Sequence, residues 1–387
     1  MRRIIPRGNE RGMALPLAVF ALVIIGALVA GIFFTGRVEQ RSGTNTAASA
    51  QAFEAAEAGV TTVLSRWTAG NYSAVQPGYS TSIARTSLGG KAAFNAEIER
   101  ISRETFLLTV EGEQFRSATQ DDANLIATRT VARLLKLDPV SMSVSSALLA
   151  RGDVTVRGTA DLSGGNTDPP TWSSGAGGVC DVNTDTLPGI ITNGDVRVSG
   201  SPTIDGDPPY EEYASVDDSA FTRPFNELAP SADITLLTGG NISPFPLAVL
   251  GDSTTCNRGS NLNWGEPYGG TGAGLVTACQ EYFPVIYSKA NLRLSNGRGQ
   301  GVLLVDGDLD LAGNFVFNGI IIVKGTFESS HGTNVVHGAV MSSNATLDDM
   351  TLAGTPTVNY SACAVSRALR GAADVSPLAG RSWVQLY

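Results

Sequence analysis

The sequence contains very little histidine and few charged side chains. Only two of its 387 residues are His, and 16% are charged. His331 and His337 have no cysteine or carboxylate at the spacing of metal ligands, so we expect turn and surface positions for them and no zinc site. The low charge argues against a disordered chain, and the length allows two or three domains with apolar cores.

Basic residues are scarce in the later part of the chain. Beyond residue 150 there are 12 Lys and Arg against 24 Asp and Glu, a net charge of −12, whereas residues 1–150 carry 15 against 12. This negative charge repels phosphate backbones, so we expect no nucleic-acid partner.

The chain lacks a complete set of catalytic groups, and we expect no enzyme. Polysaccharide-cleaving β-helix proteins use paired carboxylates on either side of a glycosidic bond. Fragments of such a set are present at Asn183–Asp185, Asp217/Asp218, Ser330–Gly332 and Asp348/Asp349. They are unevenly spaced, and no Arg-x-Lys partner accompanies them. The glycine-rich run Gly269–Gly274 lacks the lysine of a phosphate loop and indicates a flexible turn.

Calcium is the better metal candidate. Two stretches, Asp181–Thr186 and Asp306–Asp310, space carboxylates by two residues, as oxygen-ligand loops do. Neither completes a known loop, because the glycine and the terminal glutamate are missing. We therefore expect solvated turn aspartates, with Ca²⁺ as the alternative.

A long uncharged run near the N-terminus predicts a membrane helix over residues 13–35. No charged side chain stands between Met13 and Phe34, and a helix of that length spans roughly 30 Å, the thickness of the hydrocarbon core. The run is too long for a secretory signal and ends in Phe33, Phe34 and Thr35, without a small-x-small cleavage site. Arg2, Arg3, Arg7 and Arg11 precede it, which predicts a cytoplasmic N-terminus and an exported remainder.

Helical periodicity continues beyond this run over residues 36–68. Phe53, Ala56, Val60, Val63, Leu64 and Trp67 recur at steps of three and four residues. We expect one long helix that is part membrane-spanning and part amphipathic.

The N-terminal residues resemble a known family. Arg11-Gly12 precedes the apolar run, Glu39 and Asn45 follow it, and then comes "QAFEAAEAGV" at Gln51–Val60, which contains Phe53, Glu54 and Glu57. Together these resemble the N-terminal module of the PilX-type minor pilins, relatives of the type IV pilins and type II secretion pseudopilins.

This resemblance implies processing and assembly. A prepilin peptidase would cut between Gly12 and Met13, removing residues 1–12 as a leader. The implied partners are other minor pilins and the inner-membrane pilus assembly platform, with the head in the periplasm or at the pilus tip on the cell surface. Major pilins carry a glutamate at the fifth position after the cut, where this chain has Leu17, so a place at the tip or in an initiating complex is implied.

A small antiparallel β region is predicted over residues 88–138. Phe94, Ala96 and Ile98 alternate with polar residues, and strand-like runs follow at Thr105–Val110 and Leu125–Leu137. Three strands packed on the helix would form a small head, and Pro139 marks its end.

A repeated phrase predicts a parallel β-solenoid over residues 147–387. "RGDVTVRG" at Arg151–Gly158 recurs as "NGDVRVSG" at Asn193–Gly200 and "DGDLDLAG" at Asp306–Gly313. Stacked coils would bury the inward residues Val154, Val156, Val196, Val198, Leu309 and Leu311. A β-sandwich is the alternative, because the repeats are irregular.

The repeat disappears at about residues 208–284, which we expect to form an insertion off the solenoid. This stretch is rich in Pro and Gly and carries nine aromatic residues, among them Tyr210, Tyr213, Phe221, Phe225, Phe245, Trp264, Tyr268 and Tyr282. It is interpreted either as a binding surface or as a structural lid.

All four cysteines lie in the exported part, where two disulfides are expected in any of three connectivities. Cys256 and Cys279 belong to the same insertion, and a local bridge there would remove chain entropy, so we predict that they pair. Cys180 is left for Cys363, although a regular solenoid would keep them apart unless the chain doubles back.

The sequence therefore predicts an α+β, non-enzymatic minor pilin or pseudopilin with a β-solenoid head. The alternative is a single-pass envelope protein whose solenoid binds a glycan or a protein without entering a filament.

Overall fold

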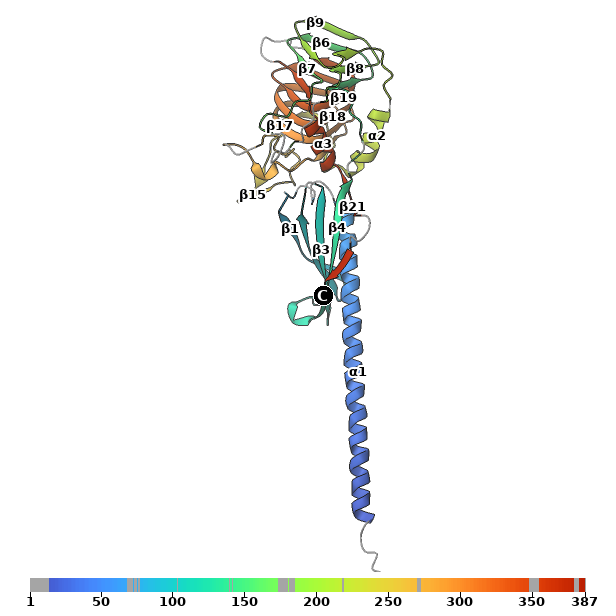
Figure 1. The fold of residues 1–387 in the computed structure, drawn as a ribbon. Helices are drawn as coiled ribbons and strands as arrows, with labels where there is room; N and C mark the ends of the chain where they lie inside the picture. The colour runs from blue at the N-terminus through green and yellow to red at the C-terminus, as the bar shows by residue number, and fades with distance from the viewer. Residues whose placement is uncertain are drawn as a thin grey trace, which may run out of the picture.

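A computed structural model describes residues 14–67, 72, 75, 77–102, 104–138, 140, 142–172, 180, 185–217, 219–269, 273–347, 355–378 and 383–386. A long helix rises from the N-terminal end, a small sheet packs on its upper part, and a larger β-rich head lies beyond that sheet (Figure 1).

The helix α1 is uninterrupted over 52 residues, Ala14–Ser65. It closes with tight turns in which the N–H groups of Arg66 and Trp67 bond to the carbonyls of Val63 and Leu64, both at 3.2 Å. The segments expected at 13–35 and 36–68 therefore form one helix, which ends three residues earlier than expected.

The small sheet is an antiparallel meander in the order β1-β2-β3-β4. Its strands are β1 (Ser80–Gly89), β2 (Ala92–Arg100), β3 (Thr105–Phe115) and β4 (Leu125–Asp138), with the short helix η2 (Asp122–Asn124) before β4. Phe94, Ala96 and Ile98 of β2 are buried, as their alternation predicts, and pack with Val60 and Val63 of α1. The region begins at Ser80, not at residue 88, because β1 is a mostly exposed edge strand without an apolar alternation.

The C-terminus returns to this small sheet, which corrects the expected extent of the head. Strands β21 (Asp374–Pro377) and β22 (Trp383–Leu386) both pair antiparallel with β4. They follow the helix α3 (Ala362–Gly371), whose Arg370 Nε lies 3.5 Å from Glu104 Oε1 of the small-sheet region. The head therefore ends before Asp374, and the small sheet is completed by residues distant in sequence.

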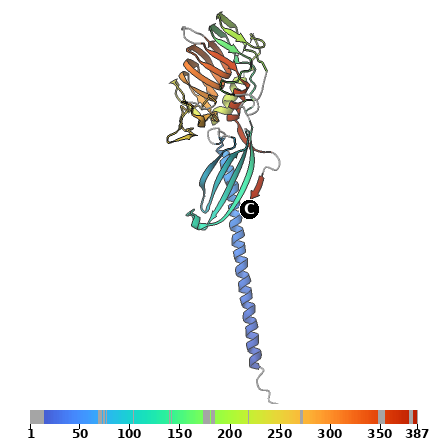
Figure 2. The same cartoon turned by 60° about the vertical axis from the view of Figure 1, so that its left-hand side comes forward.

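The head is built from parallel strands stacked in register as the coils of a solenoid, seen as successive rungs in Figure 2. Aligned residues are 17, 18 and 19 positions apart, in the pairs Val285–Val302, Val302–Ile320 and Ile320–Ala339. Runs such as Gly319–Val323 are continuously apolar because these strands are buried on both faces. The strands are β5 (Leu148–Ala150), β6 (Val154–Gly158), β7 (Asp161–Ser163), β8 (Ile190–Thr192), β9 (Val196–Gly200), β10 (Thr203–Asp205), β11 (Tyr210–Glu211), β12 (Ile234–Leu236), β13 (Gly240–Ile242), β16 (Val285–Ser288), β17 (Leu292–Val305), β18 (Leu309–His331), β19 (Val335–Leu347) and β20 (Thr357–Tyr360).

The order of the coils differs from the order of the chain. One row of aligned residues runs through the head as Ile234, Ile286, Leu303, Ile321, Val340, Leu148, Ile190 and Tyr210. The chain enters at β5, climbs to β11, crosses through the helix α2 (Ser219–Leu228) and the short helix η3 (Ala229–Ser231) to β12, and then climbs again until β19 meets β5. The chain therefore doubles back to the opposite end of one continuous solenoid, and its later coils stack against its earlier ones.

The expected inward residues separate by their place in this order. Val154, Val156, Leu309 and Leu311 are fully buried. The expectation is wrong for Val196 and Val198, which are half-buried and 48% exposed, because β9 belongs to the last coil and pairs with β6 on one side only.

The segment at 208–284 does not lie wholly off the solenoid. Within it, β11 pairs with β8, β12 with β16 and β13 with β17. The remaining part forms a lobe with the hairpin β14 (Ala248–Val249) and β15 (Asp252–Cys256) and the short helix η4 (Thr277–Cys279). Of its nine aromatic residues, only Tyr210, Tyr213 and Phe245 are exposed. Tyr268 is partly buried, and the others are buried, namely Phe221, Phe225, Trp264, Tyr282 and Phe283.

Ion pairs connect the head to the small sheet. Glu281 of the lobe accepts from Arg367 of α3 at 2.7 Å and lies 4.0 Å from Arg100 of β2. The guanidinium of Arg367 also stacks on the rings of Trp172 and Phe283. These contacts and the strand β21 hold the head above the small sheet (Figure 1).

Candidate assembly surface on the N-terminal helix

The first half of α1 has no covering from the rest of the described chain. Its large apolar side chains are exposed, Leu17 at 66% and Phe34 at 72%. By length and composition this helix can cross a membrane, and its most apolar stretch is entirely unburied. Contiguous exposed apolar surface of this extent is typical of a membrane or protein contact, because its exposure to water is unfavourable.

Three of the sequence-predicted assembly residues lie on this bare part of the helix. Leu17 is within the apolar run, and Glu39 and Asn45 are exposed just beyond it. Glu39 borders a shallow apolar concavity that also includes Leu28, Gly31 and Gly36. Because the glycines allow a close approach, this concavity suits a neighbouring helix, with the Glu39 carboxylate at its polar end.

The second half of α1 is fastened to the small sheet. Phe53 packs against the sheet's apolar cluster, and Glu57 Oε2 accepts from Arg133 Nη2 of β4 at 2.8 Å. Glu54 points outward and is exposed. Of the six predicted residues, Phe53 and Glu57 therefore position the helix, while Leu17, Glu39, Asn45 and Glu54 are open to a partner. Gly12 and Met13, the predicted processing site, lie outside the described residues.

Glycines bring the helix and the sheet into close contact. A Cβ atom at Gly112 of β3 would lie 2.1 Å from the carbonyl oxygen of Ala52, and one at Gly59 would lie 2.7 Å from the ring of Phe94. A side chain at Gly112 would require the helix backbone to move, and one at Gly59 would require Phe94 and Val110 to shift. The "AFEAAEAG" element therefore has a packing role here, because Ala52, Ala55, Ala56 and Gly59 are its buried members.

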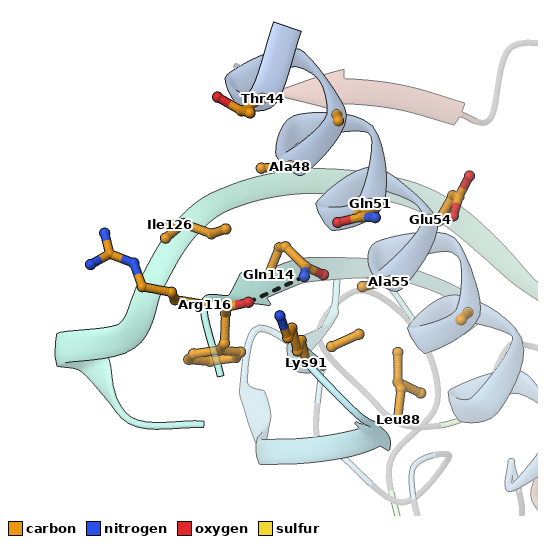
Figure 3. A pocket seen from close by; sticks show the side chains of 14 residues that line it. Thr44, Ala48, Gln51, Glu54, Ala55, Leu88, Lys91, Gln114, Arg116 and Ile126 are labelled. Carbon is orange, nitrogen blue, oxygen red and sulfur yellow. Dashed lines mark hydrogen bonds between the residues drawn. The ribbon is translucent and has the colours of Figure 1, made fainter. Parts of the chain in front are cut away.

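A groove of about 750 Å³ opens between α1 and the end of the sheet nearest the apolar half of the helix (Figure 3). Small helix residues such as Ala48 and Ala55 form one wall, and Leu88 and Ile126 form part of the other. Its charged residues are Glu54 on the helix and Lys91 and Arg116 on the sheet side. The sequence contains no motif for this groove, because it is created only when α1 meets the sheet.

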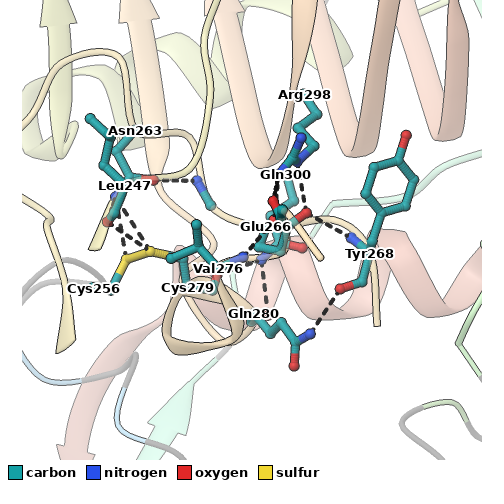
Figure 4. A network of polar contacts seen from close by, with 12 residues as sticks. Leu247, Cys256, Asn263, Glu266, Tyr268, Val276, Cys279, Gln280, Arg298 and Gln300 are labelled. Carbon is teal, nitrogen blue, oxygen red and sulfur yellow. Dashed lines mark hydrogen bonds and ion pairs between the residues drawn. A yellow bond between two sulfur atoms is a disulfide. The ribbon is translucent and has the colours of Figure 1, made fainter. Parts of the chain in front are cut away.

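The lobe of the head is held by a disulfide and a buried ion pair (Figure 4). Cys256 and Cys279 are joined, with Cα atoms 5.0 Å apart, which is the pairing expected from the sequence. Glu266, whose side chain is fully buried, accepts from Arg298 of β17 at 2.8 and 2.9 Å and from the N–H of Val276 at 3.0 Å. Gln300 donates to the Tyr282 carbonyl at 2.9 Å. The disulfide thus closes the lobe on itself, and the bonds of Arg298 and Gln300 fasten it to β17.

The second disulfide joins Cys180 to Cys363, with Cα atoms 5.3 Å apart. The Asp168 carboxylate lies within 4.8 Å of both sulfurs. Because both sulfurs are bonded to each other, this group is not arranged to hold a metal ion in the oxidised protein.

The acidic positions considered for calcium or catalysis have other partners where they are described. Asp306 pairs with Lys324 at 2.8 Å, Asp310 pairs with Arg293 at 2.8 Å, and Asp308 accepts from Asn291 at 3.1 Å. Asp217 accepts from the Ser219 N–H at 2.9 Å at the start of α2. Residues 181–184 lie outside the described residues, so solvated turn aspartates with calcium as the alternative stay the prediction for Asp181–Thr186. Asp218, Asp348 and Asp349, which were considered only for catalysis, also lie outside the described residues.

The two histidines occupy different environments. His331 is exposed, as expected. His337 is only 6% exposed, which corrects the expected surface position, and its Nδ1 has no hydrogen-bond partner in the described part of the chain. It is aligned with Asn318 in the coil below, and burial lowers its pKa to about 4.

Comparisons with known proteins give one structural similarity to report. No family model and no curated protein matches the sequence. Among solved structures, the chain is similar to the competence-associated pilin ComZ from Thermus thermophilus, at 14% identity, over 88% of this chain and 97% of that one, with a TM-score of 0.23. A TM-score this low does not establish a common fold.

Proposed function

We propose that this chain is a membrane-anchored minor pilin or pseudopilin that takes part in type IV pilus assembly or sits at the pilus tip. The observation that carries the proposal is the division of α1: its first half is apolar and bare, and its second half is packed on a small antiparallel sheet. A helix that only anchors a protein needs the bare half alone. The rigid extension places the head at a fixed distance from the membrane, as a subunit added to a bundle of helices requires.

The residues that resemble the pilin module support the same function. Arg11-Gly12 stands directly before the apolar run, and the "AFEAAEAG" element lies where α1 packs on the sheet. The proposed partners are a prepilin peptidase, other minor pilins and the inner-membrane assembly platform. Leu17 in place of a carboxylate favours a subunit used once, at the tip or in an initiating complex, over one repeated along the shaft.

N-terminal sequencing of the membrane-extracted protein tests this proposal. We expect a mature N-terminus at Met13, and we expect Gly12→Val to leave the leader attached. Gly8→Val is the matched control, because it changes a glycine of the same leader and should leave cleavage intact. A full-length wild-type N-terminus, or normal cleavage of the Gly12→Val protein, would contradict the proposal in favour of a plain single-pass envelope protein.

A further inference from the structure

The doubling back of the chain leaves one coil at the end of the solenoid farthest from α1. The last complete coil contains β8, β9 and β10, and β11 begins one further turn by pairing with β8. Strand β9 lies at the top of the head in Figure 1. Among the described strands, β9 pairs only with β6, β10 only with β7 and β11 only with β8. No described strand pairs with the outer edges of β9, β10 and β11, so these three strands form the end of the solenoid.

The last coil and the residues after it carry a group of exposed apolar and aromatic side chains. Val198 is 48% exposed, Tyr210 is 45% exposed and Tyr213 is 70% exposed. Tyrosine contributes a large rigid contact area at low entropic cost, and it is enriched in protein interfaces for that reason. Most aromatic side chains of residues 208–284 are buried or partly buried, and Tyr210 and Tyr213 are, with Phe245, the exposed ones.

Tyr213 is held in place on both sides. Its φ is +55°, in the left-handed region that a bulky residue rarely adopts. Its hydroxyl is hydrogen-bonded to Asp195, and this bond is the main reason why the pKa of Asp195 is lowered. Arg197 bridges Asp195 at 3.5 Å and Asp153 at 2.9 Å. The exposed ring is therefore presented in one orientation beside an ionised carboxylate.

This surface carries a net negative charge. Residues 190–213 contain five acidic side chains, Asp195, Asp205, Asp207, Glu211 and Glu212, and one basic side chain, Arg197, a net charge of −4. The acidic side chains are exposed or partly exposed. Glu212 also accepts from the Val196 N–H at 2.7 Å, which fixes the segment that carries Tyr213 over the edge of β9.

We propose that this distal surface, formed by Val198, Tyr210 and Tyr213 with Asp195, Glu211 and Glu212, binds a basic segment of another protein. Carboxylates pair with lysine and arginine side chains, and exposed tyrosine rings accept the same cations on their faces. The charge disfavours polyanionic partners such as nucleic acids and sulfated glycans. The inference does not depend on whether the chain enters a filament, since the surface belongs to the head alone.

Binding of a labelled peptide to the full-length protein in detergent micelles tests this inference. The probe is a fluorescent (Arg-Gly)5 peptide, followed by fluorescence anisotropy, and an (Glu-Gly)5 peptide and a neutral maltooligosaccharide serve as alternative ligands. We expect the basic peptide alone to bind, with an affinity that falls at higher salt. Tyr213→Asn, which tolerates a positive φ, and the double variant Asp195→Asn/Glu211→Gln should each weaken binding about tenfold.

Matched controls remove the same groups elsewhere. Tyr79→Asn removes another exposed tyrosine, and Glu99→Gln/Glu328→Gln removes two exposed charges away from the distal surface. These variants should bind like the wild type, and all variants should keep the wild-type far-ultraviolet circular dichroism. The inference is wrong if the controls lose as much affinity as the distal variants, if the distal variants bind normally, or if the neutral or acidic ligand binds better.

Discussion

Cys180 and Cys363 are 183 residues apart in the chain and are joined by a disulfide, with Cα atoms 5.3 Å apart. They meet because the head coils that come early in the chain stack on those that come late, with Leu148 of β5 aligned to Val340 of β19. This bond ties α3 to the segment between β7 and β8, and so links the early and late parts of the head covalently.

Loss of this long-range disulfide should destabilise the head more than loss of the local one. In the loop-entropy model, closing 183 residues restricts the unfolded chain by about 5 kcal/mol, and closing 23 residues restricts it by about 3 kcal/mol. We expect the Cys180→Ser/Cys363→Ser protein to unfold at lower denaturant concentration than the Cys256→Ser/Cys279→Ser protein, by about 2 kcal/mol. Equal midpoints for the two double variants, followed by intrinsic fluorescence, would refute this ordering.

The local disulfide should instead control proteolysis of the lobe. Cys256 lies at the end of the hairpin β14–β15, which pairs only with itself among the described strands. Non-reducing peptide mapping should recover a linked Cys256–Cys279 fragment, and added thiol should make protease cut within residues 248–279 first. Recovery of both cysteines as free thiols from exported protein would show that the bond is not formed there.

Gly112→Ala should loosen the contact between α1 and the small sheet. The added methyl group would meet Ala52 O at 2.1 Å and Ala56 N at 2.3 Å, which are backbone atoms that cannot rotate away. We expect a loss of about 2 kcal/mol or more in stability. Gly43→Ala is the control, because nothing lies within 4 Å of a Cβ there and alanine favours a helix. Hydrogen exchange of α1 amides around Ala52 should increase only in the first variant.

Stability of the head should fall in mild acid because of His337. Its pKa is lowered to about 4 by burial, below the ordinary value of 6.5, so the unfolded chain takes up the proton first as pH falls. The contribution is present above pH 6.5 and is lost between about pH 6.5 and pH 4, with a limit of about 3 kcal/mol. A His337→Gln variant should show a flatter dependence of its unfolding midpoint on pH over that window, and His331→Gln should keep the wild-type dependence. A wild-type pH dependence in the His337→Gln protein would contradict this assignment.

Leu17 should limit how often the protein enters a filament. Under the proposed function, the wild-type protein should be scarce in sheared filaments relative to a major pilin, and its loss should reduce filament number more than filament stability. Leu17→Glu should raise the amount recovered per filament, measured by quantitative immunoblotting, whereas Leu15→Glu, two residues earlier on the same exposed run, should not. Near-stoichiometric wild-type protein along the shaft would defeat this prediction.

Local patterns predicted most of the secondary structure near the N-terminus. The uncharged run and the three- and four-residue spacing of Phe53, Val60 and Val63 predict α1, because burial on one face of a helix leaves a periodic record in the sequence. The same holds for the alternation of Phe94, Ala96 and Ile98 in β2. The sequence pattern does not predict strand β1, because this exposed edge strand has no alternation of buried apolar residues.

The sequence alone determined which segments are apolar, which are charged and which repeat, and so it determined a long apolar helix, a β-rich head and the local Cys256–Cys279 pairing. Only the tertiary structure decided the order of the coils. Parallel strands of a solenoid can pair with strands far away in the chain, as β19 does with β5, and no local pattern marks such a partner. That order exposes Val198 while burying Val156, although the two stand at the same position of the repeated phrase. It also brings Cys180 to Cys363 and places Tyr213 beside Asp195 at the distal end, because contacts between distant segments leave no periodic signal in the chain.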